Sequence, residues 1–521
     1  MRKFILSGLL AFTSAVVQPG WAAGHASHVI IVVWDGMRPD FVTERFTPTL
    51  YRLARTGVTF ANHHSVYPCA TEVNGTAIST GAYPLNSGIM ANAEYRPGIN
   101  NLKGIDTQAT NSIRKGDELA GGHYLARATL AEILQNAGRK TAVAGSKQVA
   151  ILHDRALRAD DFPNGINVHE GKAIPASALD ALTNALGAFP ESPKAGALKP
   201  NEARDTWTTR ALLEHLWSNS VPDFTILWLS EPDFSQHDTG PGSETSLAGL
   251  KSSDDKLTRV LRELERRKLR DQTDIFIVSD HGFSTVARAV DLEVDLKNAG
   301  FHALREYKAP PKPDDIIIVG QGGSVLFYVT GHDADLIAKL VDFLQGQDYA
   351  GVIFTQERMS GTFALRDANI ATEEAPDVVL SLRWSANKSK TGTPGIFCND
   401  GTRKPGEGSH ASLSRFDVHN TLIATGPDFR DGFVNQLPSA NTDLAPTILW
   451  ILGIQPPAPM DGRVLSEALT IPGPKVSRPK SHRLQASRMH DDFVWHQYLQ
   501  TTTVNTTLYL DEGNGYQTPK P

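Results

Sequence analysis

Apolar residues in this chain fall into short, nearly continuous runs that alternate with stretches of helical spacing. Four of these runs have a polar group at or near the end: HVIIVVWDG, FTILWLSEPD, DIFIVSDHG and NTLIATGPD. Runs of this kind are typical of strands that are buried on both faces, as in a parallel sheet covered by helices. Helical spacing occurs between them in TPTLYRLARTG, RATLAEILQNAGRK and SSDDKLTRVLRELERRKL. The alternation predicts an α/β fold with a mostly parallel sheet sandwiched by helices.

Two later regions depart from this alternation. Residues 296–400 hold two further apolar runs, DIIIVG and SVLFYVT, and the helical pattern DADLIAKLVDFLQG. Because another core strand follows, we expect an α/β insertion within one catalytic domain at 24–470. From residue 471, IPGPKVSRPKSHR is rich in proline and basic residues, which is typical of a linker. The remaining tail to residue 521 has the pattern of a hairpin, so residues 471–521 are predicted to be a linker and a short C-terminal extension.

The first 23 residues have the pattern of a secretory signal peptide. Arg2 and Lys3 precede an apolar stretch that ends near Val17, and small residues follow up to Ala23. This stretch is shorter than the roughly 18 apolar residues that a membrane-spanning helix needs. The pattern predicts an exported protein, periplasmic or secreted, with no membrane anchor.

Charge and cysteine content exclude two classes of site. Lys and Arg number 51 against 57 Asp and Glu, a net charge of −6, so no nucleic-acid-binding surface is expected. Cys69 and Cys398 are the only cysteines, too few for a cysteine-rich metal cage, and whether they pair stays open. A small-molecule partner is expected, and the oligomeric state is not indicated.

Candidate metal ligands cluster around the ends of the predicted strands. In an open α/β sheet, functional groups gather beyond the carboxyl ends of the strands. A single Asp there is more often a cap of the next helix, but three such acids, two closely followed by histidine, favour a metal site. Two Zn²⁺ ions about 3.5–4 Å apart can clamp the attacking and leaving oxygens of a displacement at phosphorus. The candidate ligands are Asp35, Thr71, Asp233, His237, Asp280, His281 and His410.

The stretch VYPCATEVNGTAISTG, residues 66–81, holds two candidate nucleophiles, Cys69 and Thr71. A threonine hydroxyl needs an adjacent base or a metal to attack at neutral pH, and a helix start favours an oxyanion. Thr71 therefore suits a metal site of carboxylates and imidazoles, whereas Cys69 does not require one. Taken alone, Thr71 is better interpreted as the N-cap of the helix, and only the company of the candidate metal ligands favours the nucleophile.

Five segments of the chain together resemble the alkaline phosphatase superfamily, especially its nucleotide pyrophosphatase/phosphodiesterase branch. They are IVVWDGMRPDF, YPCATEVNGTAISTGAYPLNSGIMAN, EPDFSQHDTGP, VSDHGF and GSHASLSRFDVHNTLIATGPDF. The resemblance spans residues 29 to about 455 and implies an alkaline-phosphatase-like core with two zinc sites. It implies that Asp233, His237 and His410 hold one ion, and that the other is held by Asp35, Asp280, His281 and Thr71.

The resemblance also implies a reaction. Thr71 would attack phosphorus and form a phospho-threonine intermediate, and Asn92 would hydrogen-bond a phosphoryl oxygen. Lys147 matches a lysine that binds substrate in a monoesterase group of the superfamily, but Val149 stands where that group has arginine. A surface lysine explains Lys147 equally well. Hydrolysis of phosphodiester or nucleotide pyrophosphate bonds is therefore the leading prediction. An alkaline phosphomonoesterase on the same site is the alternative, and an inactive periplasmic metal- or ligand-binding protein is the third.

Overall fold

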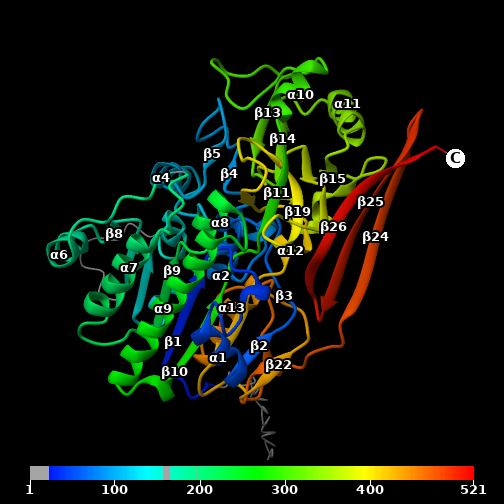
Figure 1. Ribbon diagram of the computed structural model, residues 1–521. Helices are drawn as coiled ribbons and strands as arrows, with labels where there is room; N and C mark the ends of the chain where they lie inside the picture. The colour runs from blue at the N-terminus through cyan, green and yellow to red at the C-terminus, as the bar shows by residue number, and fades with distance from the viewer. Residues whose placement is uncertain (1–22, 156–164, 195, 521) are drawn as a thin grey trace, which may run out of the picture.

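The computed structural model describes residues 23–155, 165–194 and 196–520, and it is built around a nine-stranded central sheet (Figure 1). The predicted signal peptide, apart from Ala23, lies outside the described residues. The strand order is β22-β2-β21-β10-β1-β9-β6-β7-β8. The bounds in that order are Phe433–Asn435, Val58–Phe60, Leu422–Thr425, Thr273–Val278, His28–Trp34, Phe224–Leu229, Thr141–Gly145, Gly165–His169 and Lys172–Ile174. Strands β10, β1, β9 and β6 pair in parallel, which confirms the predicted parallel core.

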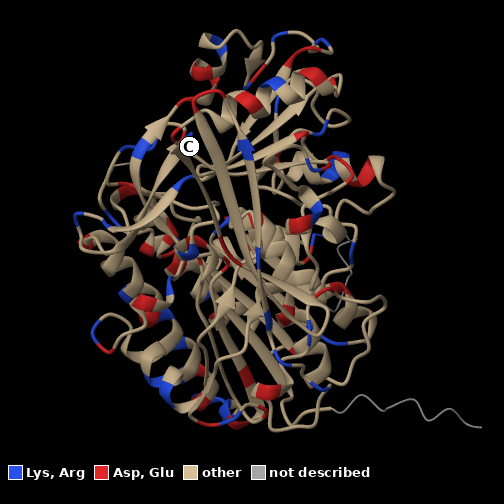
Figure 2. Ribbon diagram, turned by 90° about the vertical axis from the view of Figure 1, so that its right-hand side faces the viewer, with Lys and Arg blue, Asp and Glu red and all other residues tan. Residues whose placement is uncertain are grey.

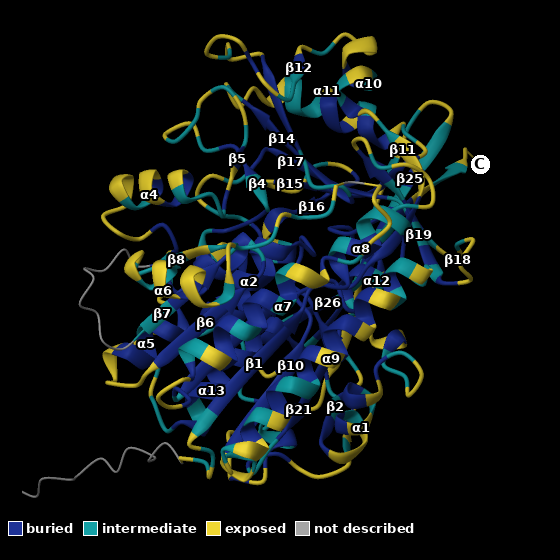
Figure 3. Cartoon of the chain, turned by 60° about the vertical axis from the view of Figure 1, so that its left-hand side comes forward, coloured by how far each residue is buried: buried dark blue, intermediate teal, exposed yellow. Residues whose placement is uncertain are grey.

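Helices cover both faces of this sheet, as the alternation predicted. Along β1, Val29, Ile31 and Val33 pack in one buried cluster with residues of α5 and α13, and the alternate residues pack in a second cluster with α1 and α9. The bounds are α1 Pro48–Thr56, α5 Leu130–Asn136, α9 Glu244–Arg266 and α13 Leu444–Ile451. Figure 3 shows the resulting contrast between buried strands and exposed outer helix faces. Burial on both faces explains why these strands are continuous apolar runs.

Strand β21, the fourth apolar run, differs from the other three because it runs antiparallel to β10. Leu422 at its start lies opposite Val278 at the end of β10. An antiparallel strand begins at the edge where its neighbour ends. The chain that leads into β21, which includes His410, therefore lies at the carboxyl edge of the parallel strands.

Residues within the predicted insertion form a second, mixed sheet of six strands. In sheet order its strands are β12 Ala303–Leu304, β13 Ile316–Gly320, β14 Ser324–Val329, β17 Val378–Leu382, β15 Ala350–Thr355 and β16 Phe363–Ala364. The two predicted apolar runs are β13 and β14, and the predicted helix is α11, Ala334–Gln345. Leu340, Val341 and Leu344 of α11 pack into the buried cluster of this sheet.

The C-terminal region forms a three-stranded antiparallel sheet of β24 Lys480–Met489, β25 Phe493–Val504 and β26 Thr507–Pro519. Figure 1 shows these long strands running beside the second sheet. Trp495 of β25 is fully buried, and its Nε1 donates to Gly361 O over 3.0 Å. The predicted hairpin corresponds to β25 and β26, which pair antiparallel. Strand β24 begins at Lys480, inside the segment that was expected to be a linker.

The remaining sequence expectations concern charge, cysteines and membrane helices. Basic and acidic residues are interspersed on the face shown in Figure 2. Cys69 and Cys398 are both free, and Cys69 is buried. Among the described residues, no helix has both the length and the apolar character needed to cross a bilayer.

Candidate active site

The predicted site residues come together at the carboxyl edge of the central sheet. Asp35 follows β1, Asp280 and His281 follow β10, and Asp233 begins helix α8, Asp233–Thr239, shortly after β9. His410 does not follow a strand of the central sheet. It follows β20, Gly408–Ser409, which pairs with the start of β11, Ser284–Val290, just after His281.

The first group is the predicted set of Asp233, His237 and His410, whose candidate ligand atoms all lie within 4.8 Å of one another. Asp233 Oδ1 lies 3.2 Å from His237 Nε2 and 3.7 Å from His410 Nε2. The spacing of four residues brings Asp233 and His237 to one face of α8.

The second group differs from the predicted one in its acids. Asp35, Asp233 and His281 satisfy the same 4.8 Å limit, while Asp280 Oδ2 lies 3.3 Å from His281 Nε2. Asp233 therefore lies between both groups. The imidazoles of His281 and His410 stack with centroids 3.7 Å apart, so the two groups are immediate neighbours.

All three histidines present the same nitrogen to this site. The Nδ1 atoms of His237, His281 and His410 lie 3.0, 2.8 and 2.8 Å from the carbonyl oxygens of Gly408, Gly282 and Cys69, respectively. A carbonyl oxygen only accepts, so each Nδ1 is the donor, and in the neutral imidazole Nε2 is then the nitrogen with a lone pair. This arrangement is typical of metal-binding histidines. It also gives Cys69 a part in the site, through its backbone.

The buried carboxylates of the site outnumber the lysine side chains that pair with them. Three oxygens, Asp35 Oδ1, Asp233 Oδ1 and Asp280 Oδ2, are buried and have no hydrogen-bond partner among the residues that the structure describes. Burial raises the pKa of Asp35 well above its usual value and that of Asp280 to about 7. Burial also opposes the charged form of Asp233, but Lys147 and His237 hold its pKa well below the usual value. Unpartnered carboxylate oxygens beside imidazole lone pairs fit divalent cations, and zinc accepts both donor types.

Thr71 is the first residue of α2, Thr71–Thr80, and its side chain does not cap that helix. Ala70 occupies the N-cap position, and Thr71 Oγ1 lies 3.2 Å from His281 Nε2. The hydroxyl thus points to the second group of ligands. Thr71 is therefore not the N-cap of α2, the alternative that the sequence had left open.

Asn92 lies against the start of α2. Its Oδ1 accepts from the backbone N–H of Glu72 over 3.0 Å, which leaves Nδ2 as the available donor beside Thr71. Helix N-termini of this kind favour anions because their N–H groups lack intrahelical partners.

Lys147 is not a surface lysine. Its Nζ lies 2.9 Å from Asp35 Oδ2 and 3.0 Å from Asp233 Oδ2, and only a quarter of its side chain is exposed. Val149, two residues on, is fully buried in the core. Lys147 therefore supplies one positive charge inside the site, and position 149 supplies none.

Several site residues were not found by reasoning from the sequence. Trp228 Nε1 donates to Asp35 Oδ2 over 2.8 Å. Asn441 Nδ2 donates to Asp280 O over 2.7 Å and to Asn74 Oδ1 over 2.9 Å, joining the loop after β10 to helix α2. Trp228 is one residue of an apolar run, and Asn441 follows β23, Ser439–Ala440, in a segment without a motif. Nothing in the sequence marked either of them.

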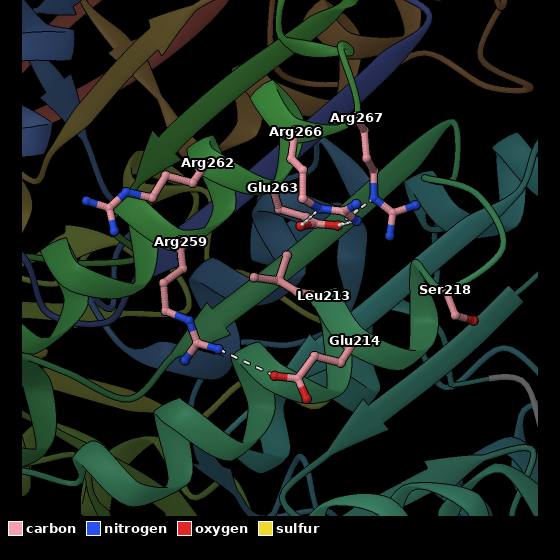
Figure 4. A pocket seen from close by; sticks show the side chains of 8 residues that line it. All are labelled: Leu213, Glu214, Ser218, Arg259, Arg262, Glu263, Arg266 and Arg267. Atoms are coloured by element: carbon pink, nitrogen blue, oxygen red, sulfur yellow. Dashed lines mark hydrogen bonds and ion pairs between the residues drawn. The ribbon is translucent and has the colours of Figure 1, made fainter.

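A surface hollow of about 510 Å³ lies elsewhere on the molecule (Figure 4). Glu263 pairs with Arg266 and Arg267 there over 2.6 Å, and Arg259 lies 3.6 Å from Glu214. Helix α9 ends at Arg266, just before β10 begins, so the hollow is at the amino edge of the sheet. Basic residues in a last helical turn are expected from the helix dipole. None of the predicted site residues lines this hollow.

A family model described as type I phosphodiesterase / nucleotide pyrophosphatase matches residues 29–404. The chain belongs to this family. The resemblance inferred from the five sequence segments is thereby confirmed. Six of the seven predicted ligands lie within the matched residues, and His410 lies beyond them, so its part in the site comes from the geometry described above.

Relatives in the type I phosphodiesterase/nucleotide pyrophosphatase family match the chain at low identity. Venom phosphodiesterase 2 of Crotalus adamanteus is 24% identical over 268 residues, 50% of this chain and 27% of the venom protein. The chain therefore spans about a quarter of the length of that relative. The bis(5′-adenosyl)-triphosphatase enpp4 of Mus musculus is 22% identical over 436 residues, 83% of this chain and 78% of the mouse protein.

Solved structures of this family share the fold. Murine ectonucleotide pyrophosphatase/phosphodiesterase 5 superposes with a TM-score of 0.61 at 18% identity, covering 85% of this chain and 100% of the murine chain. An inactive variant of the same murine protein, in complex with AMP, superposes equally well. The predicted alkaline-phosphatase-like α/β fold is therefore confirmed.

Proposed function

We propose that this chain is an exported hydrolase of phosphodiester or nucleotide pyrophosphate bonds that uses two zinc ions and Thr71 as nucleophile. One observation carries the proposal. The Nε2 atoms of three histidines and three carboxylate oxygens that lack a hydrogen-bond partner among the described residues gather in two neighbouring groups, and the hydroxyl of the buried Thr71 at a helix start lies 3.2 Å from one of these nitrogens, His281 Nε2. The names of the relatives, a venom phosphodiesterase and a bis(5′-adenosyl)-triphosphatase, favour a nucleotide substrate class.

Two sets of side chains would hold the ions. Asp233, His237 and His410 would hold the first, and Asp35, Asp280 and His281, with Thr71, the second. Asp233 lies close enough to both sets to contact either ion. When bound, the ions would supply Lewis acidity and neutralise negative charge on the phosphoryl group.

The chain's own residues would then carry out two displacements. Thr71 Oγ1 loses its proton to solvent and attacks phosphorus while the bond to the leaving oxygen breaks; that oxygen keeps the electron pair and takes up a proton from solvent. Asn92 Nδ2 donates to a non-bridging oxygen, beside the N–H groups of α2. Water then loses a proton to solvent and attacks phosphorus of the phospho-threonine, the Thr71 oxygen leaves with the electron pair and is protonated again, and configuration at phosphorus is retained overall.

The diester reading predicts a substrate preference. We expect kcat/KM for bis-p-nitrophenyl phosphate to exceed that for p-nitrophenyl phosphate by about tenfold or more, a difference of about 1.4 kcal/mol in transition-state stabilisation. Lys147 is already paired with two carboxylates, and the buried Val149 supplies no charge at the position where the monoesterase group has arginine, so a monoester dianion does not gain that second cation. Initial rates on both substrates measure this.

Two outcomes would support the alternatives. A clear monoester preference would favour the alkaline phosphomonoesterase. A metal-loaded wild type that hydrolyses no ester in a phosphate-ester panel would favour the inactive binding protein.

Trp228 offers a test of the Asp35 position. We expect Trp228→Phe to lower kcat/KM by about tenfold, because Asp35 loses the indole hydrogen bond that orients it, and such supporting bonds are worth about 10–100-fold in metal sites. Trp217→Phe is the matched control, since Trp217 is equally buried and its Nε1 bonds Thr225 instead. Equal losses in both variants would contradict a specific role for Trp228.

Export rests on the signal-like pattern of the first 23 residues. Fractionation of producing cells tests it, with the protein expected in the periplasm or the medium.

A further inference from the structure

Residues 321–324, the turn after β13 together with Ser324, the first residue of β14, reach from the second sheet to the candidate active site and are called the β13–β14 turn below. Its sequence is Gln-Gly-Gly-Ser. The turn contacts the site on two sides: Gln321 bonds the loop that carries Asn92, and Gly323 and Ser324 bond the loop that carries His410. None of the four residues belongs to the predicted ligand set.

Gln321 holds the Asn92 loop with three hydrogen bonds. Its Oε1 accepts from the backbone N–H of Asn92 over 3.1 Å and of Ala93 over 3.3 Å. Its Nε2 donates to Ala93 O over 2.8 Å. Because both the Oε1 and the Nε2 of Gln321 are hydrogen-bonded to this loop, they fix its backbone. The backbone in turn sets the direction in which the Asn92 amide points toward a substrate.

The other side of the turn holds the backbone around His410. Gly323 N donates to His410 O over 2.8 Å, and Ser324 Oγ donates to Ala411 O over 2.5 Å. Ala411 is fully buried with φ of +76°, a conformation that costs a non-glycine residue about 1–3 kcal/mol and persists only where neighbours hold it.

The two glycines of the turn allow this close approach. A Cβ at Gly323 would lie 2.5 Å from His410 O and 2.7 Å from Ser412 N. A Cβ at Gly322, where φ is +85°, would lie 2.5 Å from Ser409 Oγ. Side chains at these positions would push the His410 loop away, so the close contact depends on glycine.

We propose that the β13–β14 turn positions both sides of the active site, with Gln321 orienting Asn92 and Ser324 and Gly323 holding His410. These are positioning residues, since each of them contacts the backbone of the loop that carries Asn92 or His410. This inference rests on the proposed function for the roles of Asn92 and His410. The second sheet then contributes to the geometry of the site. One hairpin sets the spacing between Asn92, which would donate a hydrogen bond to a phosphoryl oxygen, and His410, which would bind a metal ion.

The Asn92 side is tested by a double-mutant cycle on the full chain with bis-p-nitrophenyl phosphate. Gln321→Met is expected to lower kcat/KM by about tenfold and to have no further effect in an Asn92→Ala background, because it acts through Asn92. Gln356→Met, an exposed glutamine beyond β15, is the matched control and is expected to match the wild type. Equal losses from Gln321→Met in both backgrounds would overturn this side of the proposal.

The His410 side is tested by zinc affinity, measured by competition with a chromogenic chelator. Ser324→Ala is expected to weaken one of two zinc sites by about tenfold or more, whereas Ser360→Ala, an exposed serine of the same region, leaves both unchanged. Adding Ala411→Gly to Ser324→Ala is expected to restore affinity, since glycine adopts a positive φ without strain. Unchanged zinc affinity in Ser324→Ala would overturn this side.

The two proposals fail in different ways. If the wild type hydrolyses no ester, the proposed function fails, and the zinc measurements still decide the role of Ser324. If the wild type is active but Gln321→Met and Ser324→Ala both behave like their controls, only the positioning role fails. Thermal unfolding of each variant excludes a general loss of structure as the cause.

Discussion

Thr71→Ala is expected to lower kcat for bis-p-nitrophenyl phosphate by about 10⁴-fold or more while leaving the zinc content unchanged. Removal of a covalent nucleophile costs up to about 10⁶-fold in other hydrolases, since the remaining groups cannot replace the bond to phosphorus. In the proposed mechanism the Thr71 hydroxyl forms this bond, and it lies 3.2 Å from His281 Nε2. Stopped-flow and steady-state rates, with metal analysis of the same sample, measure the effect.

Thr76→Ala is the matched control for this variant. Thr76 lies on the same helix and is also buried. Its replacement by alanine removes the same groups as Thr71→Ala, one hydroxyl and one methyl. It is expected to keep kcat within a few-fold of the wild type. Thr71→Ser, which retains a hydroxyl, is expected to keep measurable activity. Activity of Thr71→Ala within tenfold of the wild type would reject the phospho-threonine mechanism.

Removal of divalent metal is expected to abolish hydrolysis and to lower the melting temperature. Within the described part of the chain, three buried carboxylate oxygens have no hydrogen-bond partner, and Lys147 contributes one positive charge to the three acids Asp35, Asp233 and Asp280. An ion present at 1,000 times its Kd stabilises the folded protein by about 4 kcal/mol per site, and this contribution disappears on chelation. Calorimetry before and after treatment with EDTA measures the change.

Adding zinc back is the control for this experiment, and both activity and melting temperature are expected to recover. Magnesium is expected to restore less, because the three histidine nitrogens suit zinc better than a cation that prefers oxygen ligands. Full activity in a sample from which zinc has been removed, verified by elemental analysis, would contradict a metal-dependent mechanism.

The strands that position the site were predictable because their burial on both faces leaves a direct mark in the sequence. β1, β9 and β10 are continuous apolar runs, and an acid follows each one within a few residues. The ends of parallel neighbours meet at one edge. Asp35, Asp233 and Asp280 could therefore be grouped without coordinates.

The contacts among distant segments were not predictable in this way. From the sequence, Thr71 could be a helix cap and Lys147 could be a surface residue, because the type of a residue does not determine which side chains surround it. In the folded chain the hydroxyl faces His281, and the lysine lies between two carboxylates. Trp228 appeared as one more apolar residue, although its indole N–H reaches Asp35.

The sequence by itself determined the α/β class, the family and the chemistry of the donors, since periodicity and residue type are local properties that folding leaves unchanged. Only the tertiary structure decided that β21 is antiparallel and that Asp233 lies between the two ligand groups. It alone brought the turn at residues 321–324 against both Asn92 and His410. These features depend on distances between residues far apart along the chain, and such distances exist only after the sheets have packed.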